Sequence, residues 1–310
     1  MNKILVTGGS GFIGSHLIDK LVDLEYEVYN FDNHFPGFGN KRINPKAIEL
    51  HNDVRSFEAI DFATKSVDVV IHLASLSHVS TCLKDPKLCM DINVCGTFNI
   101  LEACRKNDVE RVIVAATDHI YGKNPDYYPI DEKHPWKAIY EADPYGQSKA
   151  IQAGISNTYY RTYGLPVIVT ASGNVFSERQ SSPNVIPNFI KAALSNEDLI
   201  IHGTGKQTRD IYHIDDLING YISCINTKGI EGELFNFGSG IETSVNDLAQ
   251  KILDFIPESH SIIKHILDTK YNAMDRMSLD SSKARKRIGF KISNDIDSGL
   301  KDVISKWLKL

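Results

Sequence analysis

The chain has 310 residues, 42% of them apolar, which is long enough for one large domain with a smaller second lobe. A net charge of −5 without any basic run argues against nucleic-acid binding. No apolar stretch approaches the ~18 residues of a membrane span, and the N-terminus lacks a signal-peptide pattern, so we expect a cytoplasmic protein. The cysteines and histidines show no metal-ligand spacing, which predicts reduced thiols and no metal site.

The N-terminal segment predicts a β-α-β unit. Residues 3–9 form an apolar run that ends in a glycine turn, residues 15–24 have apolar residues at helical spacing, and residues 27–33 predict a second strand. The turn TGGSGFIG carries glycines at three-residue intervals, Gly8, Gly11 and Gly14. Such glycines permit a tight turn, close approach of backbone N–H groups to a pyrophosphate, and packing of the helix on the strand. The pattern therefore predicts a dinucleotide site at the helix N-terminus.

Asp32 ends the second predicted strand, eighteen residues after Gly14. A carboxylate at this position can accept hydrogen bonds from both hydroxyls of an adenosine ribose. It would also repel a 2′-phosphate, so the sequence favours NAD over NADP.

Strands and helices continue to alternate after this unit. We predict strands at 67–75, 110–117 and 165–172, and helices over Asp91–Lys106 and Pro144–Tyr163. This alternation predicts an α/β fold with a doubly wound parallel (Rossmann) sheet and a smaller C-terminal substrate-binding lobe. The predicted division is 1–170 plus 211–239 for the NAD-binding domain and 171–210 plus 240–310 for the substrate lobe. Ligands of such sheets bind beyond the carboxyl ends of the strands.

Side chains that can exchange protons lie at the end of one predicted strand and near the start of one predicted helix. The apolar run before residue 117 stops at Thr117, Asp118 and His119, and Tyr145 and Lys149 lie four residues apart, on one face of a predicted helix. A nearby ammonium lowers the pKa of a phenol, so we expect Tyr145 to act as a base on a sugar hydroxyl. The plainer interpretation of Asp118 and His119 is a solvated strand end or a pair that orients the substrate.

At this point the chain resembles the extended short-chain dehydrogenase/reductases, and among them the NAD-dependent nucleotide-sugar epimerases and dehydratases. The resemblance covers nearly the whole chain, through the motifs TGGSGFIG, HLAS, ATDHIYG, YGQSK, GNV, HGTGKQTRDIYHIDD and DRMSLDSSKA. It implies a homodimer in which the helices that begin at Asp91 and Pro144 form a four-helix bundle. The implied substrate is a nucleoside-diphosphate sugar, although neither its base nor its sugar can be read from these motifs.

The resemblance also implies roles for individual residues. The catalytic set comprises Thr117, whose hydroxyl would donate a hydrogen bond to the reacting sugar oxygen, and Asp118, His119, Tyr145 and Lys149. The NAD-binding set comprises Gly8, Gly11, Phe12, Ile13, Gly14, Asp32, Asn33, Asp53, Val54, Leu73, Ala74, Ser75, Asn93, Tyr145 and Lys149. The substrate-binding set comprises Ser77, His78, Asn174, Arg209 and Arg276.

Members of this family oxidise the sugar at C4 and then diverge. A 4-epimerase rotates the ketone and needs no further acid or base, whereas a 4,6-dehydratase needs both near C5 and C6. Asp118 matches the Asp of the Asp-Glu or Asp-Lys pairs at this position in dTDP-glucose and CDP-glucose 4,6-dehydratases, whereas His119 departs from both pairs. Ser77-His78-Val79 and the run ASGNV also resemble motifs of dehydratases. We therefore expect a 4,6-dehydratase in which Asp118 protonates the leaving 6-hydroxyl and His119 assists at C5. The alternatives are a 4-epimerase with the same core, a keto-sugar reductase, or a non-catalytic dinucleotide-binding module.

Overall fold

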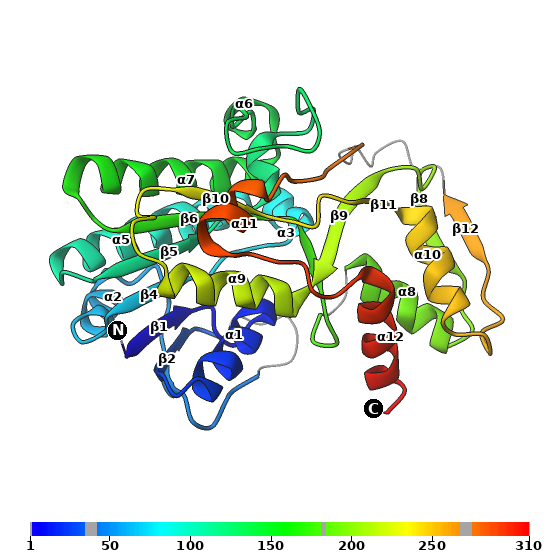
Figure 1. Cartoon of the computed structure of the whole chain (residues 1–310), viewed down its shortest axis with the longest axis horizontal. Helices are drawn as coiled ribbons and strands as arrows, with labels where there is room; N and C mark the ends of the chain where they lie inside the picture. Colours follow the sequence, from blue (N-terminus) through cyan, green and yellow to red (C-terminus); the bar gives the residue numbers. More distant parts are fainter. Residues whose placement is uncertain (1, 35–41, 181–183, 267–274, 310) are drawn as a thin grey trace.

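A computed structural model describes residues 2–34, 42–180, 184–266 and 275–309. Its centre is a seven-stranded parallel sheet with the order β10-β6-β5-β4-β1-β2-β3 (Figure 1). The strands are β1 (Lys3–Thr7), β2 (Glu27–Asp32), β3 (Ile48–His51), β4 (Val69–His72), β5 (Arg111–Ala115), β6 (Val167–Ser172) and β10 (Leu234–Phe237). The strand order turns back at β1 and β4, as in a doubly wound sheet. The predicted fold class is confirmed.

Helices cover both faces of this sheet. One face packs on α2 (Phe57–Thr64), α5 (Gly96–Lys106) and α7 (Pro144–Tyr163), and the other on α1 (Phe12–Asp23), α9 (Ile214–Asn226) and α11 (Ser282–Ile288). The strands are apolar on both sides because both sides are buried. In β4, for example, Val70 belongs to the first core, whereas Val69 and Ile71 belong to the second.

A smaller group of elements lies beyond the carboxyl ends of the central strands (Figure 1). It contains a three-stranded sheet of β7 (Asn174–Phe176), β9 (Thr208–His213) and β11 (Glu242–Ser244), and a two-stranded sheet of β8 (Leu199–His202) and β12 (Ile263–Ile266). Helices α8 (Val185–Leu194), α10 (Val245–Asp254) and α12 (Ile296–Trp307) complete a third apolar core. The predicted domain boundaries stay a prediction.

Helix α7 agrees with the sequence prediction at both ends. The Asp143 side chain accepts a hydrogen bond from the Gly146 N–H at 3.0 Å, and Gly164 ends the helix with a φ of 72°. The predicted helix from Asp91 instead begins as one π-helical segment, η1 (Asp91–Cys95), before α5. The edge strand β3 and helix α2 were not predicted, because their short apolar runs carry little periodicity.

The remaining short elements lie in the connections that follow β4 and β5. They are α3 (Val79–Lys84), α4 (Pro86–Met90), the 3₁₀ turn η2 (Asp118–Tyr121) and α6 (Ala138–Glu141). None of the helices within the described ranges is long and apolar enough to cross a membrane.

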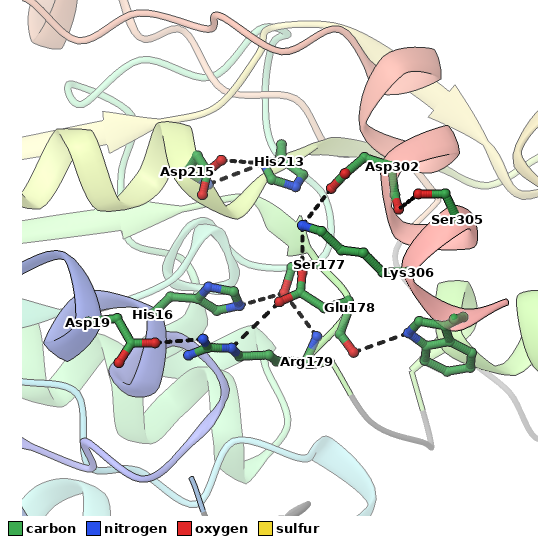
Figure 2. Close-up of polar contacts among 11 residues, drawn as sticks. His16, Asp19, Ser177, Glu178, Arg179, His213, Asp215, Asp302, Ser305 and Lys306 are labelled. Atoms are coloured by element: carbon green, nitrogen blue, oxygen red, sulfur yellow. Dashed lines mark hydrogen bonds and ion pairs between the residues drawn. The ribbon is translucent and has the colours of Figure 1, made fainter. Parts of the chain in front are cut away.

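A polar network joins helix α1 to the smaller group of elements (Figure 2). Arg179, just after β7, forms an ion pair with Asp19 of α1 at 2.6 Å, and the neighbouring Glu178 lies 3.6 Å from Lys306 of α12. Burial and the charge of Arg179 lower the pKa of His16, also on α1, to about 4, so its imidazole is neutral at physiological pH. These contacts fix the helix that follows the glycine turn against the C-terminal helix.

Candidate active site

The glycine turn between β1 and α1 forms a cradle that side chains would fill. Gly8 has a φ of +71°, and a Cβ atom there would lie 2.8 Å from the backbone of Ala74. A Cβ atom on Gly14 would lie 2.2 Å from the Gly8 carbonyl oxygen. Helix α1 starts after Gly11 with no acidic residue in its first turn, and the first N–H groups of a helix lack intrahelical partners. The turn therefore fits the pyrophosphate of a dinucleotide.

Two carboxylates lie beside this turn, at the ends of β2 and β3. Asp32 accepts hydrogen bonds from the backbone N–H groups of Ser10 at 3.0 Å and His34 at 2.7 Å. A carboxylate has about four acceptor positions, so it can still accept from ribose hydroxyls. The paired Arg55 guanidinium is the largest cause that lowers the pKa of Asp53 to about 2. Both groups suit the adenosine end of a dinucleotide.

A single cavity of about 1410 Å³ extends from this turn to the smaller lobe. Its volume exceeds that of ordinary small-molecule pockets, which are roughly 300–1,000 Å³. The predicted site residues that line it are Gly8, Gly11, Phe12, Ile13, Gly14, Asp32, Asn33, Asp53, Val54, Leu73, Ala74, Ser75, Ser77, His78, Thr117, His119, Tyr145, Lys149, Asn174 and Arg209. The cavity thus brings together the predicted dinucleotide and sugar sites. Within the described ranges, no cluster of His, Cys, Asp and Glu side chains could hold a metal ion.

Three predicted site residues do not line the cavity: Asn93, Asp118 and Arg276. Asn93 is fully buried behind the wall, where it accepts hydrogen bonds from the Ser75 hydroxyl and the Leu76 N–H. Arg276 forms a two-pronged ion pair with Glu242, at 3.0 and 2.6 Å. This pairing engages the guanidinium that the sequence predicts to bind the substrate.

Tyr145 and Lys149 of α7 reach the cavity beyond the end of β5. The Lys149 ammonium donates a hydrogen bond to the Ala115 carbonyl at 2.5 Å, and burial lowers its pKa to about 7. Burial likewise raises the pKa of Tyr145, because a phenolate is poorly solvated there. The prediction of a lowered pKa for Tyr145 is therefore wrong, because desolvation by burial raises it.

The residues that follow β5 point in different directions. Thr117 caps the turn η2, and its hydroxyl donates to the Asp118 carboxylate at 2.9 Å. The same hydroxyl is hydrogen-bonded with Tyr145. His119 lines the cavity, with its ring edge-on to that of Tyr145 at a centroid distance of 5.5 Å. Asp118 is only 2% exposed, which differs from the expectation of an acid that faces the substrate. The expected donation from Thr117 to the sugar stays a prediction, and in the protein alone the hydroxyl proton is directed to Asp118.

Sequence reasoning missed Asp143, which lines the cavity and caps the helix that carries Tyr145. The available signal was the dipeptide Asp-Pro before this helix, since proline is favoured at the first helical position and aspartate just before it. Asp143 therefore fixes where Tyr145 enters the site.

Comparison with known proteins identifies the family. Residues 4–238 match the family model described as "NAD dependent epimerase/dehydratase family". The chain belongs to this family. It is accordingly NAD-dependent, and the glycine turn and Asp32 are suited to hold the cofactor.

Relatives of this epimerase/dehydratase have different names. The chain is 38% identical to a putative UDP-glucose 4-epimerase of Methanocaldococcus jannaschii, over 99% of this chain and 98% of that one. It is 33% identical to a dTDP-D-glucose 4,6-dehydratase of Bos taurus, over 84% and 74%. The structure resembles a UDP-glucose 4-epimerase of Thermotoga maritima with UDP-glucose, with a TM-score of 0.91, 27% identity, and 99% of both chains covered. The dTDP-glucose 4,6-dehydratase DesIV of Streptomyces venezuelae, with NAD and TYD bound, gives 0.90 and 28%, over 99% and 97%.

Proposed function

We propose that the chain is an NAD-dependent nucleoside-diphosphate-sugar 4,6-dehydratase. The observation that carries this proposal is His119, which lines the cavity with its ring against Tyr145. A 4-epimerase needs only the Thr-Tyr-Lys core, whereas elimination of water needs a further group that exchanges protons. Imidazole, with an ordinary pKa near ~6.5, can serve as either acid or base at neutral pH.

The first step is oxidation of the 4-hydroxyl. Tyr145 takes the hydroxyl proton, and the buried Lys149 beside it in the cavity favours the phenolate when it is charged. NAD, when bound, supplies the oxidised ring that accepts a hydride from C4 and later returns it. Arg209 and Asn174 line the cavity from β9 and β7, where they can bind the diphosphate and the sugar.

The second step is loss of water from the 4-keto sugar. The ketone acidifies the C5 proton, which His119 removes while the C6–O bond breaks. The imidazolium then gives this proton to the departing 6-hydroxyl, which leaves as water. One imidazole balances both transfers, and this assignment is supported by the burial of Asp118, the acid expected from the sequence. The hydride taken from C4 would be returned to C6 and a proton from solvent would be added to C5, while Tyr145 releases to solvent the proton it took, so that the product keeps the 4-ketone and is lighter by one water.

The product mass tests this proposal. The protein is incubated with UDP-, dTDP- and CDP-glucose, and loss of one water from any of them supports dehydration. His119→Gln should abolish the loss of water, whereas His260→Gln, at an exposed histidine outside the cavity, should not. A product of unchanged mass with inverted C4 would overturn the dehydratase assignment.

A 4-epimerase is the second candidate. Two observations favour it: Asp118 does not line the cavity, and the M. jannaschii relative, matched over nearly both whole chains, is named as a putative UDP-glucose 4-epimerase. Such an enzyme would use Thr117, Tyr145 and Lys149 in the same way and return the hydride to the other face of C4. His119 would then only contact the rotating sugar.

We also propose a homodimer through α5 and α7. Phe98 of α5 is 50% exposed and Tyr163 of α7 is 56% exposed. Exposed aromatic side chains on two neighbouring helices are suited to an interface between copies of the chain.

A further inference from the structure

We propose that Asp118 is a positioning residue that competes with the Tyr145 phenolate for the single proton of the Thr117 hydroxyl, and so favours the protonated form of Tyr145. This inference rests on the proposed function, because it concerns the oxidation of a sugar hydroxyl by Tyr145. It gives Asp118 a role that acts through Thr117, without contact to the substrate.

The placement of Asp118 is the first observation. Thr117 and His119, its neighbours on either side, both line the cavity, whereas Asp118 does not. The turn η2 begins immediately after the extended Thr117, which has φ −159° and ψ 159°, and it carries the Asp118 side chain into the protein. With 2% of its surface exposed, this carboxylate is poorly placed to reach a sugar.

The hydrogen bonds of Thr117 are the second observation. A hydroxyl has one proton to donate and two lone pairs that accept. Its proton goes to the Asp118 carboxylate at 2.9 Å, and one lone pair accepts from the His119 N–H at 3.4 Å. On the cavity side Thr117 contacts Tyr145, and this contact lowers the pKa of Tyr145. Asp118 competes for the single hydroxyl proton on which this effect depends, because a Thr117 that donates to Asp118 cannot donate to the phenolate as well.

The charges around Tyr145 act in the same direction. Burial is the largest cause that raises the pKa of Tyr145, and the carboxylates of Asp118 from η2 and Asp143 from the start of α7 raise it further, whereas the contact with Thr117 lowers it. Cys82 from α3 lies nearby as a thiol whose own pKa is raised. His119 contacts its ring, and Lys149 lies on the same helix. Since Asp118 both bonds to Thr117 and bears a charge, it is the group whose removal should most favour the phenolate.

The buried tyrosines near Asp118 do not take the place of Thr117 as its hydrogen-bond partner. Burial is the main cause that raises the pKa of Tyr121 and Tyr212, and the charge of Asp118 adds to it. Their hydroxyls are bonded to Asn236 at 2.6 Å and Ser172 at 2.8 Å, whereas the Asp118 carboxylate accepts from the Thr117 hydroxyl. The chemical consequence is that Tyr145, once it has taken the proton of the 4-hydroxyl, holds that proton more firmly than it would without Asp118.

The test compares wild-type protein with Asp118→Asn in the NAD-bound form. ¹³C-labelled tyrosine reports ionisation of Tyr145 by NMR, and the Tyr145→Phe spectrum assigns the signal. In parallel, the pH dependence of NAD reduction is followed in a single turnover with the nucleotide sugar. Loss of one nearby charge and one charge-assisted bond should lower both midpoints by about one pH unit, which is a tenfold change in the proton equilibrium. Asp254→Asn, at an exposed position of α10, should change neither midpoint.

A second pair of variants tests the route through Thr117. In a Thr117→Val background the Asp118→Asn change should have at most half of its effect, and in Thr117→Ser the effect should persist. Unchanged midpoints in Asp118→Asn would overturn the proposal, as would an equal effect without the Thr117 hydroxyl. Normal NAD reduction with a keto sugar that keeps its 6-hydroxyl would instead make Asp118 the dehydration acid. If none of the nucleotide sugars tested reduces NAD in the wild-type protein, the proposed function fails, while the NMR titration still decides the role of Asp118.

Discussion

Replacement of Lys149 by methionine is predicted to stabilise the NAD-free protein at neutral pH. Burial lowers the pKa of Lys149 to about 7, compared with 10.5 for an unperturbed lysine. Between these values the unfolded chain binds more protons than the folded protein, so the free energy of unfolding rises with pH in this window. At ~1.4 kcal/mol per pKa unit, the rise amounts to roughly 5 kcal/mol.

The methionine variant lacks this pH-dependent rise. It also lacks the hydrogen bond to Ala115, and this loss lowers its free energy of unfolding by about 1 kcal/mol. We therefore expect Lys149→Met to be more stable than wild type by about 4 kcal/mol near pH 7, and to lose this advantage near pH 10. Urea denaturation at several pH values measures the difference, from which titrations common to both proteins cancel. A difference that stays constant from neutral to alkaline pH would refute the reasoning, because Lys149 would then have an ordinary pKa.

Four further predictions concern the cofactor site, the dehydration step and the interface. His119→Gln should slow loss of water by at least ~100-fold while NAD reduction continues, as followed by product mass and absorbance. Gly8→Ala should lower the free energy of unfolding by about 1–3 kcal/mol, because a left-handed φ and the Ala74 backbone 2.8 Å away both oppose a Cβ atom. The same change should weaken NAD binding, which calorimetry measures. Asp32→Ala should weaken NAD binding about tenfold and reduce the preference over NADP. Phe98→Glu should shift the molar mass in light scattering from dimer to monomer, since it places a charge on an exposed face of α5.

Local sequence patterns were sufficient for the fold and for much of the cavity wall. The glycine turn, the acid at the end of β2, and the Tyr145–Lys149 pair each depend on spacing within one element, which the sequence displays directly. Parallel topology then places the strand ends along one edge of the sheet. These residues could be assigned to one site without knowledge of any distance.

Tertiary contacts determine the features of the site that the sequence did not predict. Arg276 pairs with Glu242 of β11, 34 residues away in the sequence. Its position outside the cavity therefore depends on where the fold places β11. Asp118 turns inward because Thr117 caps a 3₁₀ turn at that point, whereas an extended strand end would have exposed alternate side chains. The raised pKa of Tyr145 depends on how deeply the folded protein buries it, which spacing along a helix does not reveal.

The most direct measurement follows the hydrogen on C4 of the sugar. A nucleoside-diphosphate glucose that carries deuterium at C4 is incubated with the protein, and the product is analysed by mass spectrometry and NMR. The account predicts a product lighter by one water, with the deuterium at C6, and no product from Tyr145→Phe. A product with deuterium still at C4 would contradict dehydration, and loss of the deuterium to solvent would contradict internal return of the hydride.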